Sequence, residues 1–93
     1  MIRHVVCFKL KDSSLIPQWQ RDSEMLASIE TVESFSAVPV LKQDRFHCAL
    51  YMEFEDRAAL QIYQDHGTHK RYLAEILPPI VADKLVVDLL ESE

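Results

Sequence analysis

The sequence predicts a single α+β domain with the element order βαββαβ, and three observations indicate it. Segments in which apolar and polar residues alternate, the period of a half-buried strand, lie near both ends of the chain and in its middle. Segments with the helical spacing of apolar residues lie between them. The length of 93 residues allows one two-layer core and no second one. We therefore expect residues 1–93 to form one domain.

The first predicted strand runs from Ile2 to Leu10. Its even-numbered residues are apolar except for His4, whereas the odd-numbered ones include Arg3 and Lys9. The even-numbered face should therefore look at a core, with His4 on it. A buried histidine must find hydrogen-bond partners, because leaving its ring nitrogens unsatisfied costs free energy. His4 is thus a residue that needs an explanation.

The first predicted helix follows and extends to about Thr31. The cap-type residues 12–14 and Pro17, which suits a first helical turn, mark its start. Large apolar residues recur in it near helical spacing, namely Leu15, Trp19, Leu26 and Ile29. Trp19 is a candidate ligand-binding residue, although an amphipathic helix has to bury its large residues and ordinary core packing is the commoner role.

The second predicted strand, Ser34 to Lys42, is expected at a sheet edge, because Pro39 cannot donate a hydrogen bond to a neighbouring strand. A short polar connection at residues 43–45 then favours an antiparallel hairpin with a third strand. That third strand, Cys48 to Phe54, is the clearest in the chain. One face of it is apolar and consists of Cys48, Leu50, Met52 and Phe54.

The second predicted helix spans Arg57 to Asp65. Asp56 offers a side-chain oxygen to its first free amides, and the helix should stop near Gly67. Leu60 and Tyr63 lie three residues apart and share a helical face, which places the phenol over the apolar side of the preceding strand.

A further helical piece is predicted from about His69 to Leu77, with Thr68 as its cap. His69 lies on its apolar face, because His69, Tyr72, Leu73 and Ile76 have the spacing i, i+3, i+4, i+7. The pair Pro78-Pro79 ends this piece, and Val81 to Leu90 supplies the last strand.

This order of elements favours a four-stranded antiparallel sheet with both helices on one face, the ferredoxin-like arrangement. The opposite face would be bare. It is too apolar for open water, because it carries Val5, Cys7, Val38, Val40, Ala49 and Tyr51. We therefore expect a second copy of the sheet to cover it, which makes the protein a homodimer.

Composition excludes several partners and compartments. The net charge of -5, without a basic stripe, argues against nucleic acid. No apolar run approaches the roughly 20 residues needed to span a bilayer, and the N-terminus alternates where a signal peptide would be continuously apolar. Two cysteines on opposite strand parities should not pair, which fits a reducing compartment. We therefore expect a cytoplasmic protein without a membrane partner.

Three segments of the sequence resemble the stress-responsive dimeric α/β-barrel family, often called Dabb. They are RHVVCFKLKD, DRFHCALYMEFEDRAALQIYQDHGTH and LVVDL. The likeness runs nearly end to end. The family usually has His-Pro-x-His after the tyrosine, and here Gly67 replaces that proline. The resemblance implies a homodimer of ferredoxin-like protomers whose sheets pack as a dimeric α/β barrel, with a cavity between sheet and helices in each protomer.

One plant branch of this family contains a polyketide cyclase that closes its substrate by aldol condensation without metal or cofactor. Its catalytic residues correspond by motif to His4, Tyr63 and His69, whereas most members have no defined activity. The resemblance therefore implies a small-molecule pocket and, as an alternative, a cofactor-free enzyme for enolisable carbonyl or polyketide-like substrates. The candidate ligand-binding residues are Val6, Phe8, Trp19, Leu50, Met52 and His66.

The chemistry of the three candidate catalytic residues fits such a reaction. An imidazole near neutral pKa can take an acidic proton, and a phenol can hydrogen-bond the oxyanion. The helix N-terminus at His69 should disfavour the imidazolium and keep this base neutral. Two other interpretations stay open: the three side chains satisfy one another in a filled core, or they line a binding pocket without chemistry.

Other site classes find little support in the sequence. His66 and His69 lie three apart, but no cysteine or carboxylate stands at a ligand spacing beside them, so we expect no metal and no cofactor. There is no GxSxG motif and only one glycine, which excludes a nucleophile elbow and a phosphate-binding loop.

Overall fold

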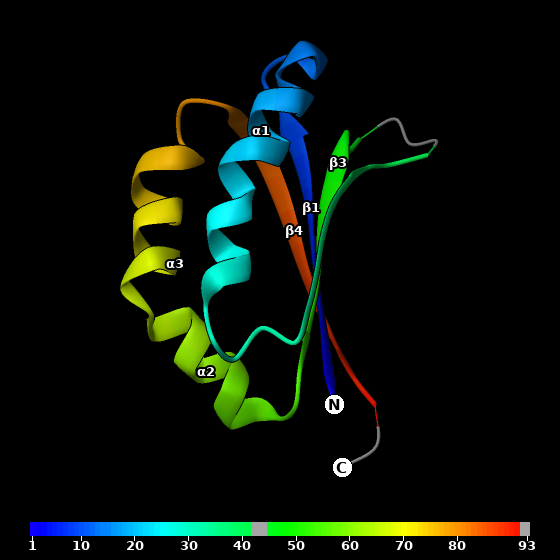
Figure 1. The fold of residues 1–93 in the computed structure, drawn as a ribbon. Coiled ribbons are helices and arrows are strands. Elements are labelled where there is room, and N and C mark those ends of the chain that lie inside the picture. The colour runs from blue at the N-terminus through cyan, green and yellow to red at the C-terminus, as the bar shows by residue number, and fades with distance from the viewer. Residues whose placement is uncertain (42–44, 92–93) are drawn as a thin grey trace.

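The computed structural model describes residues 1–41 and 45–91, which form one antiparallel sheet with a layer of helices on one face (Figure 1). The strands are β1 (Ile2–Leu10), β2 (Ser34–Pro39), β3 (Cys48–Phe54) and β4 (Val81–Leu90). The helical segments are η1 (Ser13–Leu15), α1 (Ile16–Ser23), η2 (Glu24–Ser28), α2 (Arg57–Asp65), α3 (Gly67–Arg71) and η3 (Tyr72–Ile76). The predicted order βαββαβ and the ferredoxin-like arrangement are confirmed.

The strand order is β2-β3-β1-β4, so that β1 lies between β3 and β4 and β2 lies at an edge. All three strand pairs are antiparallel. The edge position of β2 was predicted from Pro39, and Pro39 is the last residue of that strand. The prediction that this strand continues to Lys42 is wrong at its end, because Val40 and Leu41 lie outside β2. Lys42 itself and the predicted connection through Gln43 and Asp44 lie outside the described residues.

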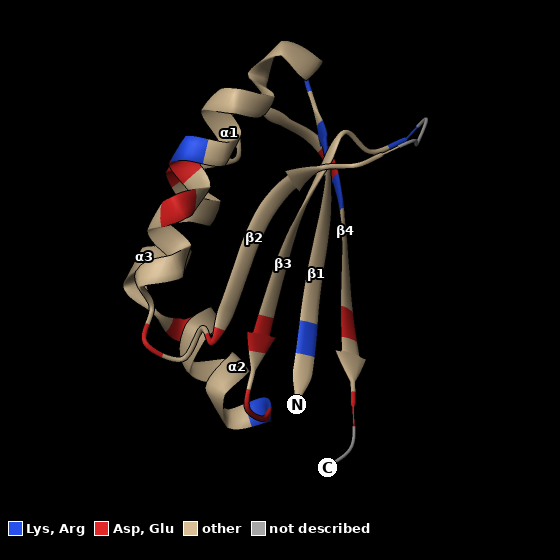
Figure 2. Ribbon diagram, turned by 45° about the vertical axis from the view of Figure 1, so that its right-hand side comes forward, with Lys and Arg blue, Asp and Glu red and all other residues tan. Residues whose placement is uncertain are grey.

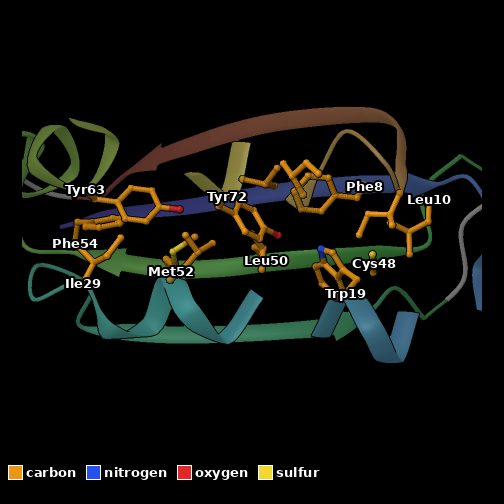
Figure 3. Packing of buried hydrophobic residues seen from close by; sticks show 14 of the residues in the cluster. Phe8, Leu10, Trp19, Ile29, Cys48, Leu50, Met52, Phe54, Tyr63 and Tyr72 are labelled. Carbon is orange, nitrogen blue, oxygen red and sulfur yellow. The ribbon is translucent and has the colours of Figure 1, made fainter. Parts of the chain in front are cut away.

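The hydrophobic core lies between the sheet and the helices, as the alternation of β1 and β3 predicts. The even-numbered residues of both strands are buried, whereas the odd-numbered ones are partly or fully exposed. Figure 3 shows Tyr63 beside Phe54 at one end of this core and Trp19 beside Phe8 at the other. His4 is one of these buried residues, at only 5% exposed, so its predicted direction toward the helices is confirmed.

The first helix is shorter than the predicted one. Regular α-helix ends at Ser23, a 3₁₀ segment continues to Ser28, and Ile29 is already extended. At the end of the 3₁₀ segment the Ser28 hydroxyl donates to the Met25 carbonyl at 2.7 Å, which gives that carbonyl a partner outside a helical ladder. The prediction of helix up to Thr31 is therefore wrong at its C-terminal end.

The region between α2 and α3 also differs from the prediction in one detail. Asp56 caps α2 as expected, accepting the Ala59 amide at 2.9 Å. The cap of α3 is His66 and not Thr68, because His66 is extended and its Nδ1 accepts the Thr68 amide at 3.0 Å. The helix therefore begins at Gly67, before the predicted start at His69.

The outer face of the sheet carries no helix and has an apolar centre. Charged residues lie toward the strand ends and leave the middle of the sheet free of charge (Figure 2). Besides the predicted Val5, Cys7, Val38, Ala49 and Tyr51, this face includes Leu85, Val87 and Leu89 of β4, which are 38–50% exposed. None of the described helices is long and apolar enough to cross a membrane.

Candidate functional site

A cavity of about 130 Å³ lies between the sheet and the segment from α2 to η3. Its walls come from β1, β3 and β4 on one side and from the helical layer on the other. The lining residues are His4, Val6, Phe8, Leu50, Tyr63, Gln64, His69, Tyr72, Leu73, Leu77, Lys84 and Val86. The structure thus brings all three candidate catalytic residues, His4, Tyr63 and His69, to one cavity.

The candidate ligand-binding residues divide into two groups. Val6, Phe8 and Leu50 line the cavity. Trp19 and Met52 do not, because both are fully buried in the core. His66 is also absent from the lining, since its ring caps α3. Strand parity and helical spacing identify the helix-facing side correctly, but they do not show which part of that side the helices fill.

His4 is held by a carboxylate that the sequence reasoning missed. The Nδ1 atom of His4 hydrogen-bonds Oδ1 of Asp88. The two residues face each other across the antiparallel ladder between β1 and β4, and directly paired residues share a face. A carboxylate accepts hydrogen bonds, so the Nδ1 of His4 carries the hydrogen. Among the described residues no hydrogen bond engages His4 Nε2.

His69 has the same tautomer for a different reason. Its Nδ1 lies 3.1 Å from the Gln64 carbonyl oxygen, which can only accept, so Nδ1 donates and Nε2 keeps its lone pair. Burial lowers the pKa of His69 below its ordinary 6.5. The hydrogen bond to Gln64 opposes this shift, whereas the electrostatic interactions with His4 and Lys84 add to it. The ring is therefore neutral at pH 7, as expected from its helix position, with burial as the main cause.

Tyr63 lies between the two histidines. Its ring centre is 5.9 Å from that of His4 and 4.5 Å from that of His69. Burial raises the pKa of Tyr63 well above its ordinary value, so the phenol stays protonated and able to donate. Within the described part of the chain its hydroxyl has no hydrogen-bond partner. The three side chains thus surround a cavity and do not satisfy one another in a filled core.

A π-helical turn, η3, shapes the end of the cavity. The Leu77 amide bonds the Tyr72 carbonyl at 3.1 Å, five residues back, and this wider turn carries lining residues Tyr72, Leu73 and Leu77. The Tyr72 hydroxyl lies 2.7 Å from Ser23 Oγ of α1, and burial raises the pKa of Tyr72 to about 12. Tyr72 is thus a partnered wall residue, in contrast to Tyr63.

Metal binding has little geometric support. No group of three or more potential ligands comes together within residues 1–41 and 45–91. His66 and His69 use their Nδ1 atoms on different backbone groups, the Thr68 amide and the Gln64 carbonyl. The arrangement instead places the His4 and His69 rings and the Tyr63 phenol along one cavity.

Comparison with known proteins places this cavity in a family context. The model of the stress responsive A/B barrel domain, Dabb, matches residues 2–90. The chain belongs to this family. A Dabb family protein with a ferredoxin-like fold from Mesorhizobium loti is 30% identical, with 99% of this chain and 97% of that chain covered and a TM-score of 0.89. No curated protein matches the chain.

Two more distant structures share the fold of this Dabb domain. A dimeric ferredoxin-like protein of unknown function from Thermobifida fusca is 24% identical, covers 95% of this chain and 88% of its own, and has a TM-score of 0.78. The hydroxynitrile lyase of Passiflora edulis is 19% identical, with 99% of this chain and 94% of that chain covered and a TM-score of 0.82. At these identities the likeness establishes the fold alone.

The site residues that sequence reasoning missed come from the helical layer, namely Gln64, Tyr72, Leu73 and Leu77, and from β4. Lys84, Val86 and Asp88 share one parity, so alternation places them on one face together. Alternation does not reveal which face of β4 meets the helices, because VADKLVVDLL is mixed on both. Only the register with β1, which pairs Asp88 with His4, decides it.

Proposed function

We propose that this Dabb domain is a homodimeric small-molecule-binding protein whose cavity promotes the enolisation of a small carbonyl compound without a cofactor. One observation carries the proposal: two imidazoles with available Nε2 atoms and one unpartnered phenol surround a single apolar cavity. An apolar pocket with a few convergent polar groups is the usual form of a small-molecule site.

His69 is the proposed base. Its neutral Nε2 takes a proton from the carbon next to the carbonyl, the electrons of that C–H bond form a C=C bond, and the carbonyl π electrons move to oxygen. The Tyr63 hydroxyl donates a hydrogen bond to the resulting oxyanion. Delivery of a solvent hydrogen to the carbon, in place of the proton that was removed, gives exchange. Attack of the enolate carbon on a second carbonyl of the same molecule closes a ring, and the proton held by the imidazole then passes to the new alkoxide oxygen.

The pair of His4 and Asp88 supplies a second acid-base group. Because Asp88 holds Nδ1–H, His4 is fixed in one ring orientation. The same carboxylate stabilises the imidazolium that forms when Nε2 takes a proton. His4 can therefore receive or return a proton at the substrate on the sheet side, while His69 acts from the helical side.

The cavity volume limits the ligand. An apolar cavity of about 150 Å³ in another protein holds one benzene molecule. At about 130 Å³, the enclosed part of the ligand is comparable to one small ring or a short chain. This favours a short carbonyl compound over the long chain expected from the polyketide resemblance, or a longer ligand whose remainder lies outside the mouth.

The homodimer is supported by the apolar outer face of the sheet. The Thermobifida fusca neighbour and a Bacteroides fragilis protein of similar fold are both described as dimeric. A stable pair should bury at least roughly 1,000 Å² in total. Sedimentation at micromolar concentration should give the mass of two chains, and a monomer there would refute this part of the proposal.

Val5 offers a more specific test of the dimer. Val5→Glu places a charge at the apolar centre of the outer face and should dissociate the pair, whereas Glu24→Gln, on the helical side, should not. Equal effects of the two changes on the sedimenting mass would contradict an interface on this face.

The chemistry is tested by hydrogen exchange of a neutral ketone. The native protein should speed the loss of the proton NMR signal next to the carbonyl of cyclohexanone in D₂O, above the rate in buffer alone. Saturation-transfer NMR on the same samples reports binding. Binding without exchange would support a binding protein and overturn the catalytic part of the proposal. The absence of both binding and exchange, for cyclohexanone and for phenylacetone, would overturn the whole proposal.

A further inference from the structure

Among the described residues that line the cavity, Lys84 alone carries a permanent charge. It lies on β4 opposite Phe8, on the side of the sheet that faces the helices. The remaining walls are apolar or neutral, and no aspartate or glutamate is among the lining residues. A lysine at this position therefore sets the sign of charge that the cavity can accept.

Lys84 also marks the mouth of the cavity. A second, more open hollow of about 370 Å³ adjoins the first and is lined by Leu73, Leu77, Pro78, Val81, Ala82, Asp83 and Lys84. Lys84, Leu73 and Leu77 are common to both spaces. A ligand with its carbonyl group at Tyr63 and His69 would thus extend past Lys84 on its way to solvent.

Nearby acidic groups already have other partners. Asp83, which also lines the open hollow, pairs with Arg45, whose Nη2 lies 3.0 Å from Asp83 Oδ2. Asp88, on the same face of β4, bonds His4, and Glu75 of η3 pairs with Arg71. In the described part of the chain the Lys84 side chain has no ion pair. Its field reaches the site, since it contributes to the low pKa of His69.

We propose that Lys84 binds an anionic group of the ligand, so that the cavity takes a short oxo acid with its carboxylate at the mouth. This inference rests on the proposed function and specifies its ligand class. A carboxylate at Lys84, which is exposed at the mouth of the cavity, forms a charge-assisted hydrogen bond there. The same cation also favours the negative charge that develops on the enolate.

The simplest alternative is that Lys84 protects the exposed edge of β4 from pairing with another strand, a common role of edge lysines. That role requires a charge but no ligand. The two roles differ in one measurable respect: only the ligand-binding role makes the cavity prefer an acid to its neutral ester.

The test compares levulinate, a short oxo acid, with methyl levulinate, which has the same ketone and no charge. NMR titration should show that the native protein binds levulinate about tenfold more tightly at low salt, with the preference declining as salt is added. Lys84→Met keeps the length of the side chain and removes the charge, and it should abolish this preference. Lys70→Met is the matched control, because Lys70 is exposed on α3 and does not line the cavity.

The outcomes separate this inference from the proposed function. Exchange of both compounds without preference for the acid, or the same preference in Lys84→Met, would overturn the inference and leave the enolisation proposal intact. A preference for levulinate that depends on Lys84, without exchange, would support the inference and overturn the catalytic proposal. No saturable binding of levulinate at millimolar concentration would overturn the inference.

Discussion

The strands β3 and β4 both pair with β1, yet the side chains that face the helices are buried on β3 and exposed on β4. Every even-numbered residue of β3 is buried, whereas β4 is exposed along almost its whole length. The helical segments α1 and η2 fill the space over β2 and β3 with Trp19 and Leu26, both fully buried. Over β1 and β4, α3 and η3 leave the cavity.

This difference separates a closely packed region from a region with a cavity within one small sheet. A packed interior has no room for a ligand and gains its stability from close contact of apolar side chains. The cavity on the β4 side gives up such contacts, and it keeps polar groups with unused hydrogen-bonding capacity, namely the Tyr63 hydroxyl and the two Nε2 atoms. We refer to the region around Trp19, Leu26 and Met52 as the packed side. The residues that line the cavity form the cavity side.

The largest expected effect is on the packed side. Trp19→Ala should lower the free energy of unfolding by about 3–5 kcal/mol, because it leaves a cavity where a fully buried indole contacts Phe8. Val86→Ala, on the cavity side and 47% exposed, should cost less than about 1 kcal/mol. Urea denaturation measures both, and equal losses would remove the distinction between the two sides.

Substitution of the proposed base, His69, should lower the exchange rate strongly and the stability only slightly. His69→Ala should lower the exchange rate of cyclohexanone about 10²-fold or more, since acid-base groups typically contribute that much. Its cost in stability should be about 0.5–1.5 kcal/mol, for the hydrogen bond to Gln64. Met52→Ala is the matched control on the packed side: it should cost about 2–5 kcal/mol and leave exchange intact below its melting temperature.

Tyr63→Phe sharpens the comparison further, because it removes only the unpartnered hydroxyl. If the phenol serves the ligand, the free energy of unfolding should change by less than about 0.5 kcal/mol while exchange falls by about 10²-fold. Tyr72→Phe breaks the bond to Ser23 and should destabilise by about 1 kcal/mol. A reversed order of these two stabilities would mean that Tyr63 is the structural phenol.

The smallest effect is the pH dependence that His69 adds. The folded protein lowers the pKa of this ring below 6.5, so in mildly acidic solution the unfolded chain binds more protons than the folded one. Stability should therefore fall as the pH drops from about 6.5, and exchange should fall with it as the base becomes protonated. His69→Gln should make unfolding less sensitive to acid over this range, and an unchanged slope would contradict the lowered pKa.

Much of this arrangement could be predicted from the sequence, because it depends on local periodicity. Alternation in β1 places His4 inward, and helical spacing directs Tyr63 and His69 back to the sheet. Trp19 and Met52 follow the same rules and face the same layer, but periodicity does not show that α1 fills the space around them. Periodicity therefore does not distinguish a ligand-binding residue from a core residue.

The residues on β4 could not be assigned from the sequence for a different reason. His4 and Asp88 are 84 residues apart in the chain, and their contact depends on the register between β1 and β4. Tertiary packing sets that register. The role of His66 as the cap of α3 depends on an extended backbone at that residue, which its sequence neighbours do not specify. The positions of His4, Tyr63 and His69 can thus be predicted from local sequence patterns. The charged residues Asp88 and Lys84 are placed by long-range strand pairing, which those patterns do not show.

The protonation of His69 on the cavity side can be measured directly by long-range ¹H–¹⁵N NMR of the histidine rings at pH 7. The structure predicts hydrogen on Nδ1 of His69 and an unprotonated Nε2. The proposed function predicts that the Nε2 signal changes when cyclohexanone is added, and His69→Gln, which lacks this ring, identifies the signal by its loss. A His69 ring with hydrogen on Nε2, or one whose signals do not respond to any carbonyl compound that binds, would contradict the claim that this cavity holds a base.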